Sequence, residues 1–328
     1  MLVGYTGASI PELFVDECHG VEDCYDFDRR MARIHVWDIS WLYDDFRHFV
    51  HLSLLVLSLS VFGNPKILVL ISSVLLLVVS YLLSVNLTKS KPAGIVTMVV
   101  ILQSSVFYSY DTSVTYPSFW ALLFVTSLYL VTTKWYASPI PYLLSIPAKA
   151  ITAVFFPAFI AFTWLSDIPK DVKKKVTVLF AGIITGFLLL FVAVSVDFLF
   201  DEDKGGIFKL ITVPNWEKFA EGFFSWVWKG FANDQITVVI LIFSTFILLT
   251  KMRNKPNVKA ILALTWLLIL TSPFLIGMTT YDVWPYRMLV HVVAIALMTG
   301  FLVTDLSWTR TFLGKATSSP AKEQEQKP

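Results

Sequence analysis

The sequence has few charged residues, and this scarcity excludes several classes of protein. Charged side chains make up 15% of the 328 residues, whereas a soluble domain carries about 25%. A soluble globular enzyme and a disordered chain are therefore excluded. The net charge of +2 offers no basic surface to match a phosphate backbone, so we expect no nucleic-acid partner. Nucleotide-binding loops, nucleophile elbows and HExxH motifs are also missing, and nothing supports an ATPase, a serine hydrolase or a zinc protease.

Cysteine is scarce too. The two cysteines, Cys18 and Cys24, lie in a polar N-terminal segment. Their spacing permits a small disulfide loop outside the cytoplasm and free thiols in a reducing compartment, and both alternatives stay open. A metal site built from Cys18, His19 and Cys24 lacks a fourth ligand at zinc-finger spacing. We expect no resident cofactor, and leave a divalent metal requirement open.

Long apolar runs are what the sequence does have. Hydrophobic residues make up 56% of the chain, and the mean hydropathy is +0.68. These values predict an all-α, polytopic transmembrane helical bundle with about 8–10 membrane segments and amphipathic helices on its outer surface. The clear apolar segments are Ile67–Val85, Ala93–Tyr110, Ser118–Thr133, Val176–Val196, Ile236–Thr250, Ala260–Met278 and Met288–Val303.

Two further stretches are ambiguous. Phe49–Phe62 is apolar but short, and we favour an interfacial or re-entrant helix over a genuine span. Pro139–Leu165 is interrupted by prolines and carries Lys149 at its middle. Because a lysine at mid-bilayer is costly, we predict that the chain turns there, between a short leg, Pro139–Ala148, and a full span, Ala150–Leu165.

The distribution of lysine and arginine predicts the orientation, since these residues are enriched in cytoplasmic loops. If the proline-broken stretch crosses twice, all the basic clusters fall on the cytoplasmic face. The C-terminus then lies in the cytoplasm and the protein is an integral, multi-pass component of a plasma membrane or an endomembrane. The clusters are Lys89 and Lys91; Lys170 and Lys173–Lys175; Lys251, Arg253, Lys255 and Lys259; and Arg310, Lys315, Lys322 and Lys327.

Three regions follow from these patterns. Residues 1–48 are an acidic extracytoplasmic segment, with no signal peptide, because no apolar run precedes Pro11. Residues 49–306 form the transmembrane helical domain. Residues 307–328 are a polar cytoplasmic tail, which we expect to be disordered.

Candidate chemistry lies in the loops assigned to the outer face. Asp16 and Glu17 are adjacent carboxylates, able to act as a general base or bind a cation, or else part of a solvated acidic loop. Asp111 follows an apolar run and either faces a cavity between spans or caps the next helix.

Two cations complete this set. Lys149 lies at the helix break, where a lysine pairs with a lipid phosphate or extends to the headgroups. Arg287 follows Tyr286 directly before an apolar run. It either binds phosphate oxygens with both guanidinium arms or anchors an aromatic belt. Between these loops, 215–229 has the mixed pattern of an amphipathic helix on the membrane surface.

This arrangement resembles the GT-C superfamily of polytopic glycosyltransferases, which take sugar from a polyprenyl-phosphate carrier on the outer or lumenal face. Asp16-Glu17 resembles the family's acidic pair on the first outer loop, and Asp111 its hairpin aspartate. Lys149, within Ile146–Ala150, resembles the lysine of a broken helix, and Tyr286-Arg287 the late arginine. Family members have a span before the acidic loop. This chain has none, so either its start is truncated or that helix has been lost.

The resemblance implies a mannosyltransferase-like enzyme whose donor is a polyprenyl-phosphate-linked sugar. Asp16, Glu17 and Asp111 would be catalytic, with Asp16 or Glu17 removing a proton from the acceptor hydroxyl. Lys149 and Arg287 would bind the lipid phosphate. The implied partners are the lipid bilayer, the sugar donor and a membrane partner subunit.

Two other functions stay open. A transporter would have internal repeats and discontinuous helices meeting near the midplane, and the broken stretch finds no partner segment in the other half of the sequence. A non-catalytic membrane subunit of a larger complex is favoured by the short chain and the missing first span.

Overall fold

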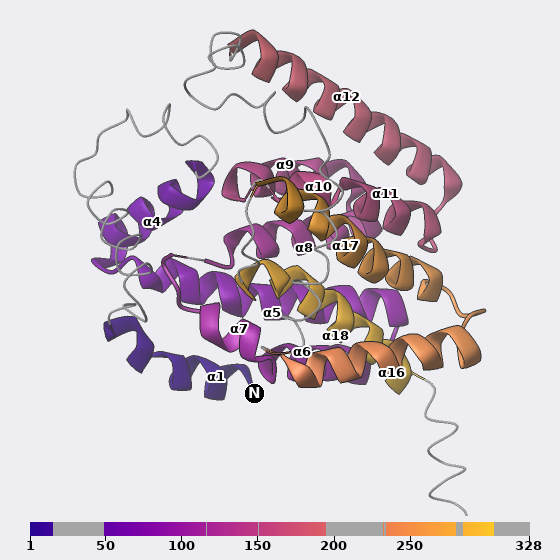
Figure 1. Ribbon diagram of the computed structural model, residues 1–328, viewed down its shortest axis with the longest axis horizontal. Helices are drawn as coiled ribbons and strands as arrows, with labels where there is room; N and C mark the ends of the chain where they lie inside the picture. The colour runs from indigo at the N-terminus through magenta and orange to yellow at the C-terminus, as the bar shows by residue number, and fades with distance from the viewer. Residues whose placement is uncertain are drawn as a thin grey trace, which may run out of the picture.

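The computed structural model describes residues 1–15, 49–115, 117–149, 151–194, 232, 234–279 and 285–304. Every regular element within these residues is a helix, and the helices pack into one layered bundle (Figure 1). The elements are α1 (Leu2–Ser9), η1 (Pro11–Phe14), α4 (Phe49–Phe62), α5 (Lys66–Thr88), α6 (Lys91–Leu102), α7 (Ser105–Tyr110), α8 (Phe119–Thr133), η3 (Trp135–Ala137), α9 (Pro139–Ala148), α10 (Ile151–Val154), α11 (Phe156–Leu165), α12 (Lys170–Val194), α16 (Gln235–Lys251), α17 (Val258–Thr279), η5 (Pro285–Met288) and α18 (Leu289–Val303).

Two of the expected continuous segments are each divided into two helices. The first, Ala93–Tyr110, is divided after Leu102, because the Ser104 hydroxyl caps a new helix by accepting the Phe107 backbone N–H at 3.4 Å. The second, Ala150–Leu165, is divided at Phe155. The prediction of unbroken helices in these two places is wrong.

The break at Phe155 is held by aromatic packing. The Phe155 ring is fully buried and lies 5.8 Å from the Phe124 ring, edge to face, and 5.7 Å from the His291 ring. Pro157 in the first turn of α11 suits the start of a helix, since proline there sacrifices no helical hydrogen bond. Packing against rings that are far away in the sequence therefore decides where this segment divides.

Helix α18 is the central element and is buried along most of its length. Small residues let it approach α5 and α6 closely. A Cβ added to Gly300 would lie 2.6 Å from Thr97 Oγ1 and 2.7 Å from Ser84 Oγ. The Thr97 hydroxyl in turn bonds Ser84 Oγ at 2.8 Å. Small residues and hydroxyls at such a crossing are typical of helix packing in membranes.

By length and composition, two helices could cross a membrane: Lys66–Thr88 and Tyr286–Val303. Shorter apolar helical stretches of 10–17 residues occur in six further places within the described residues, one of them in α4, whose bounds are those of the stretch expected to lie at the interface. The fold is therefore all-helical with two candidate membrane-spanning helices, and the number of crossings stays a prediction.

The bundle has two chemically different ends, and α5 runs from one to the other. Its first residue, Lys66, bonds the backbone of η1, and the carbonyl of Leu87, near its last residue, accepts from Asn257 Nδ2 at 3.0 Å. Asn257 Oδ1 also accepts the Asp167 backbone N–H at 2.6 Å. Asn257 thus joins its own loop to the α11–α12 loop and to the C-terminal end of α5, and we call this end of the molecule the basic end.

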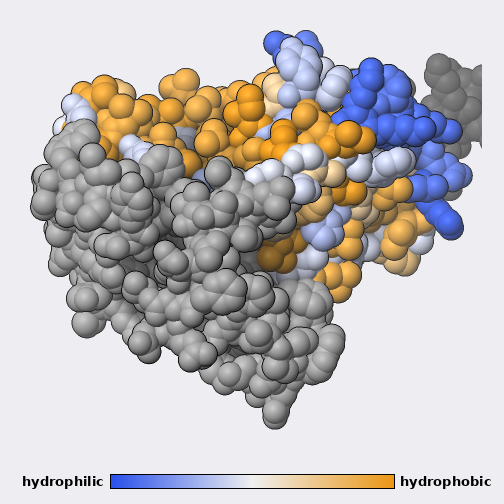
Figure 2. Space-filling view, turned by 90° about the horizontal axis from the view of Figure 1, so that it is seen from above, coloured by the Kyte–Doolittle hydropathy of each residue, from blue (hydrophilic) through white to orange (hydrophobic). Residues whose placement is uncertain are grey.

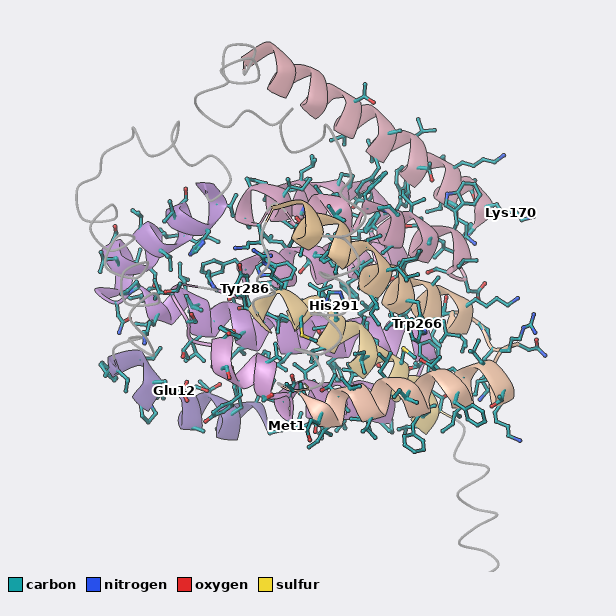
Figure 3. The ribbon with its side chains drawn as sticks, in the orientation of Figure 1. Met1, Glu12, Lys170, Trp266, Tyr286 and His291 are labelled. Atoms are coloured by element: carbon teal, nitrogen blue, oxygen red, sulfur yellow. The ribbon has the colours of Figure 1, made fainter. Side chains whose placement is uncertain are left out.

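The basic end carries exposed cations, and Figure 2 shows a hydrophilic patch at one end of an otherwise largely apolar described surface. Glu12 and Lys170 lie toward opposite ends of the bundle (Figure 3). We call the end near Glu12 the Asp111 end. The exposed cations of the basic-end loops are Lys89, Lys91, Lys170, Lys174, Lys175, Lys251, Arg253 and Lys259.

Candidate functional site

The turn that carries Lys149 is built by its neighbours in sequence. Helix α9 ends at Ala148, and Lys149 takes an extended conformation as its C-cap. The Thr152 hydroxyl and backbone N–H both donate to the Lys149 carbonyl, at 2.8 and 3.1 Å. The Tyr142 hydroxyl reaches across the turn and donates to the Thr152 carbonyl at 3.0 Å. The predicted turn at Lys149 is therefore confirmed, and its shape is fixed on both sides.

Lys149 and Arg287 approach the same aromatic ring. The Lys149 ammonium lies 4.6 Å from the centroid of the Tyr286 ring, a cation–π distance. The Arg287 guanidinium carbon lies 5.8 Å from the same centroid, and its Nε donates to the Tyr286 hydroxyl at 3.3 Å. Tyr286 itself is buried, with 3% of its surface exposed. Two positive charges are thus gathered at one rigid side chain.

Arg287 also lies where the backbone is electropositive. It belongs to η5, which leads directly into α18, and the N-cap residue of α18, Met288, makes no side-chain capping hydrogen bond. The N-terminal end of a helix carries a partial positive charge, which disfavours a cation and favours an anion. Lys149, Arg287 and the α18 N-terminus therefore form an electropositive region suited to an anion.

Asp111 lies at the end of α7 in a different environment. Only 1% of its surface is exposed. Its Oδ2 accepts the Tyr5 hydroxyl at 2.6 Å and the Ser9 hydroxyl at 3.3 Å. Ser73 Oγ donates to its backbone carbonyl at 2.7 Å. Among the described residues, Oδ1 finds no hydrogen-bond partner.

This burial changes the protonation of Asp111. Desolvation raises the pKa of its carboxyl from 3.8 to about 6, opposed by the hydrogen bond from Tyr5 and assisted by the negative charge of Glu12. Burial and the Asp111 charge also raise the pKa of the Tyr5 hydroxyl, which keeps this group protonated as the donor. Asp111 is therefore bound to the N-terminal segment by a hydrogen bond in which the Tyr5 hydroxyl is the donor.

The N-terminal segment, α1 and η1, is attached at several further points. Thr112 Oγ1 donates to Glu12 Oε2 at 3.1 Å. The buried Lys66 ammonium donates to the carbonyls of Glu12 and Val15, at 3.1 and 2.5 Å. These bonds end at Val15, the residue before Asp16. The segment is thus anchored just ahead of the acidic pair that the sequence singled out.

The Asp111 and Tyr286 groups are neighbours. Tyr110 precedes Asp111, and its ring meets the Tyr286 ring edge to face at 5.9 Å. In Figure 3 Tyr286 lies toward the interior of the bundle from Glu12. The structure therefore brings Lys149 and Arg287 together at Tyr286 and places the Tyr110–Asp111 hairpin beside them, whereas the Asp111 carboxyl itself contacts Tyr5 and Ser9.

Other predicted residues lie outside the described part of the chain. These are Asp16, Glu17, Cys18, His19, Cys24 and the 215–229 segment. Within the described residues, no three metal-ligating His, Cys, Asp or Glu side chains gather. The roles of Tyr5, Ser9 and Glu12 were not predictable from the sequence pattern. The helix around Tyr5 is short and weakly patterned, so no periodicity pointed to it.

The site thus defines a class of protein: an all-helical bundle that gathers two cations and a buried carboxyl at one end. No protein-family model, no curated protein and no solved structure matches the chain.

Proposed function

We propose that this chain is a multi-pass membrane glycosyltransferase of the GT-C type, which transfers a sugar from a polyprenyl-phosphate carrier at the Asp111 end. The observation that carries the proposal is the convergence of Lys149 and Arg287 on Tyr286, beside the hairpin of Asp111. Paired cations at a helix N-terminus suit a phosphate group. In a membrane, the polyprenyl chain attached to such a phosphate would lie in the bilayer.

The exposed apolar surface supports a membrane location beyond the two long helices. One face of α16 exposes large hydrophobic side chains along its whole length, and Phe246 is 67% exposed. A soluble protein rarely exposes a contiguous apolar patch of this extent. In a bilayer the same face lies against acyl chains. The residues of this face are Ile236, Val239, Ile242, Phe243, Phe246 and Leu249.

The contrast between the ends supports the orientation. The exposed lysines of the basic end fit a cytoplasmic face. The Asp111 end then faces outward, where polyprenyl-phosphate sugars are used by the enzymes that this chain resembles. In this orientation the C-terminal residues after α18 lie in the cytoplasm.

The proposed reaction is an inverting displacement. The acceptor hydroxyl oxygen forms a bond to the anomeric carbon while the bond from that carbon to the phosphate oxygen breaks. Asp16 or Glu17 takes the hydroxyl proton, and the departing electron pair stays on the phosphate. Lys149 and Arg287 stabilise the added negative charge as it develops.

Asp111 has a supporting role in this proposal. Because its Oδ2 already accepts from Tyr5 and Ser9, it holds the N-terminal segment in place and so positions the acidic pair that follows Val15. The resemblance alone assigned Asp111 to catalysis. Its burial favours anchoring, and removal of the carboxyl would lower transfer by releasing the segment.

Transfer from a defined donor tests the proposal. The full chain in proteoliposomes is given polyprenyl-phosphate mannose with a labelled sugar and a membrane extract as the source of acceptor. We expect the wild type to transfer the sugar. In the Asp16→Asn/Glu17→Gln variant we expect the rate of transfer to fall by about 100-fold or more, the effect that loss of a general base usually has. The matched control is Asp44→Asn/Asp45→Asn, which changes another acidic pair of the same segment. Full activity in the first variant would refute the assignment of the base.

Labelling with a membrane-impermeant maleimide tests the sidedness. In a Cys18→Ser/Cys24→Ser background, Tyr108→Cys reports on the Asp111 end, where this side chain is 49% exposed. Lys174→Cys reports on the basic end. We expect the two positions to be labelled from opposite sides of sealed vesicles, and labelling of both from one side would refute the membrane arrangement.

A further inference from the structure

We infer that Tyr286 is a positioning residue that holds Lys149 and Arg287 together as one binding site for a lipid-linked phosphate. This inference rests on the proposed function and deepens it, because it explains how two cations from distant loops are directed at one group. Lys149 comes from the α9–α10 turn and Arg287 from η5. The two loops meet at the Tyr286 ring.

The geometry gathers both cations on one side chain. The π face holds the Lys149 ammonium at 4.6 Å from the ring centroid. The hydroxyl accepts from Arg287 Nε at 3.3 Å. A ring is rigid, so fixing one cation on its face and the other at its edge sets the separation between them. Lysine and arginine side chains otherwise have many rotamers, which an unaided site would have to order when it binds.

The ring is held in turn by its surroundings. Tyr286 is almost fully buried, and the edge-to-face contact with Tyr110 at 5.9 Å orients it. Tyr110 belongs to the helix that ends at Asp111. The two cations are therefore positioned relative to the hairpin that anchors residues 2–15.

The Tyr286 ring also offsets repulsion between the two cations. Two like charges near one ring repel each other, and the positive end of the α18 dipole adds to that repulsion. The electron-rich face of tyrosine compensates part of this cost, and a phosphate bound between the two cations would reduce it further. Tyr286 therefore helps to keep the two cations close together as well as aligned.

Binding of undecaprenyl monophosphate to the full chain in nanodiscs tests this inference, with undecaprenol as the neutral lipid of equal length. We expect the phosphate to be preferred, and Lys149→Met and Arg287→Met each to weaken its binding about tenfold, the effect of losing one charge-assisted contact. Exposed Lys134→Met and Tyr136→Phe are the matched controls, and neither should change the affinity.

The decisive variants are Tyr286→Phe and Tyr286→Leu. The phenylalanine keeps the ring face and loses the hydroxyl, so we expect binding to weaken about threefold. Because the hydroxyl interacts with both cations, the same change should have a smaller effect in the Lys149→Met and the Arg287→Met backgrounds than in the wild type. Tyr286→Leu should weaken binding about as much as the loss of a cation.

A tyrosine that only fills space would not show this coupling between its hydroxyl and the two cations. Additive effects of Tyr286→Phe in both backgrounds would overturn the inference, even if Tyr286→Leu fails to fold. If the wild type does not distinguish undecaprenyl monophosphate from undecaprenol, the proposed function fails instead. If the wild type and the two cation variants behave as expected but Tyr286→Phe and Tyr286→Leu bind normally, the inference alone is wrong.

Discussion

The two ends of the bundle handle charge in opposite ways. At the basic end the lysines and arginines of the loops are largely exposed, and the loops are joined by the neutral side chain of Asn257. At the Asp111 end the ionisable groups are buried or half-buried and contact one another. Lys66 bonds backbone carbonyls there, Asp111 accepts from hydroxyls, and Lys149 lies over an aromatic ring.

This difference shows at which end of the molecule polar groups are held in a fixed geometry. A buried charge is costly unless its partners compensate it, so such groups persist where they position something. Exposed charges on loops cost little and hold nothing in a defined geometry. At the basic end the hydrogen bonds of charged side chains are exposed to solvent, as is the one from Lys173 Nζ to the Trp164 carbonyl at 2.9 Å. The buried ionisable groups with defined partners at the Asp111 end agree with a polar site there. Variants at the two ends should therefore have effects of very different size.

The largest expected effect comes from Asp111→Leu. The Tyr5 hydroxyl would remain buried without its acceptor, which costs about 3 kcal/mol, whereas Ser9 Oγ can still donate to the Tyr5 carbonyl at 3.2 Å. We expect the free energy of opening of residues 2–15 to fall by this amount while α8 and α11 keep theirs. Hydrogen–deuterium exchange measured by mass spectrometry reports both regions. Asp167→Leu, at an exposed position of the basic end, is the control, and unchanged protection of residues 2–15 in Asp111→Leu would show that Asp111 is not the anchor.

A pH dependence of the same contact comes next. Burial raises the pKa of Asp111 from 3.8 to about 6, whereas in the open segment it returns to its ordinary value. At a pH between these two pKa values, the state in which residues 2–15 are packed against Asp111 (the closed state) therefore binds more protons than the state in which they have opened. Its stability is greatest below pH 4 and falls by about 3 kcal/mol in total as the pH rises through and beyond 6.

Exchange of residues 2–15, corrected for the intrinsic rate at each pH, measures this fall. Tyr5, Ser9 and Glu12 are the groups facing the carboxyl, and the Tyr5 hydroxyl stays protonated throughout this range. Asp111→Asn should make the profile flat. Protection that increases from pH 4 to 6 would contradict the assignment.

At the basic end, Asn257→Ala should have a smaller effect that does not depend on pH. Asn257 has a left-handed backbone, with a φ of 62°, and its amide bonds Leu87 and Asp167. Alanine would lose both bonds and strain the backbone, at a cost of about 2 kcal/mol. Asn257→Gly, which accepts this φ, should cost about half as much. Thermal unfolding in detergent measures both variants, and equal losses would exclude the backbone contribution.

Local patterns predicted part of this fold. The bounds of α4 and α9 agree with the predicted stretches, and the turn at Lys149 followed from prolines and from the cost of a lysine at mid-bilayer. The breaks at Ser104 and Phe155 did not follow. At Phe155 the deciding contacts are rings from α8 and α18, which lie far away in the sequence.

The candidate site divides in the same way. Asp111, Lys149 and Arg287 could be singled out because ionisable residues are rare beside apolar runs. The bond from Tyr5 to Asp111 joins residues 106 positions apart, and no periodicity encodes it. Tyr286 was visible as a neighbour of Arg287, but its contact with Lys149 exists only after α9 and η5 have packed together.

The smallest expected effect is that of Lys175→Ala at the basic end. Lys175 Nζ lies 4.0 Å from Asp171 Oδ2, and the two side chains are 61% and 67% exposed. Water competes for both charges, so we expect the free energy of unfolding to change by less than about 0.5 kcal/mol. Thermal unfolding of this variant beside Asp111→Leu places the two ends on one scale. A loss from Lys175→Ala as large as that from Asp111→Leu would mean that exposed charge also holds this fold together, and the contrast between the ends would then say nothing about where the site lies.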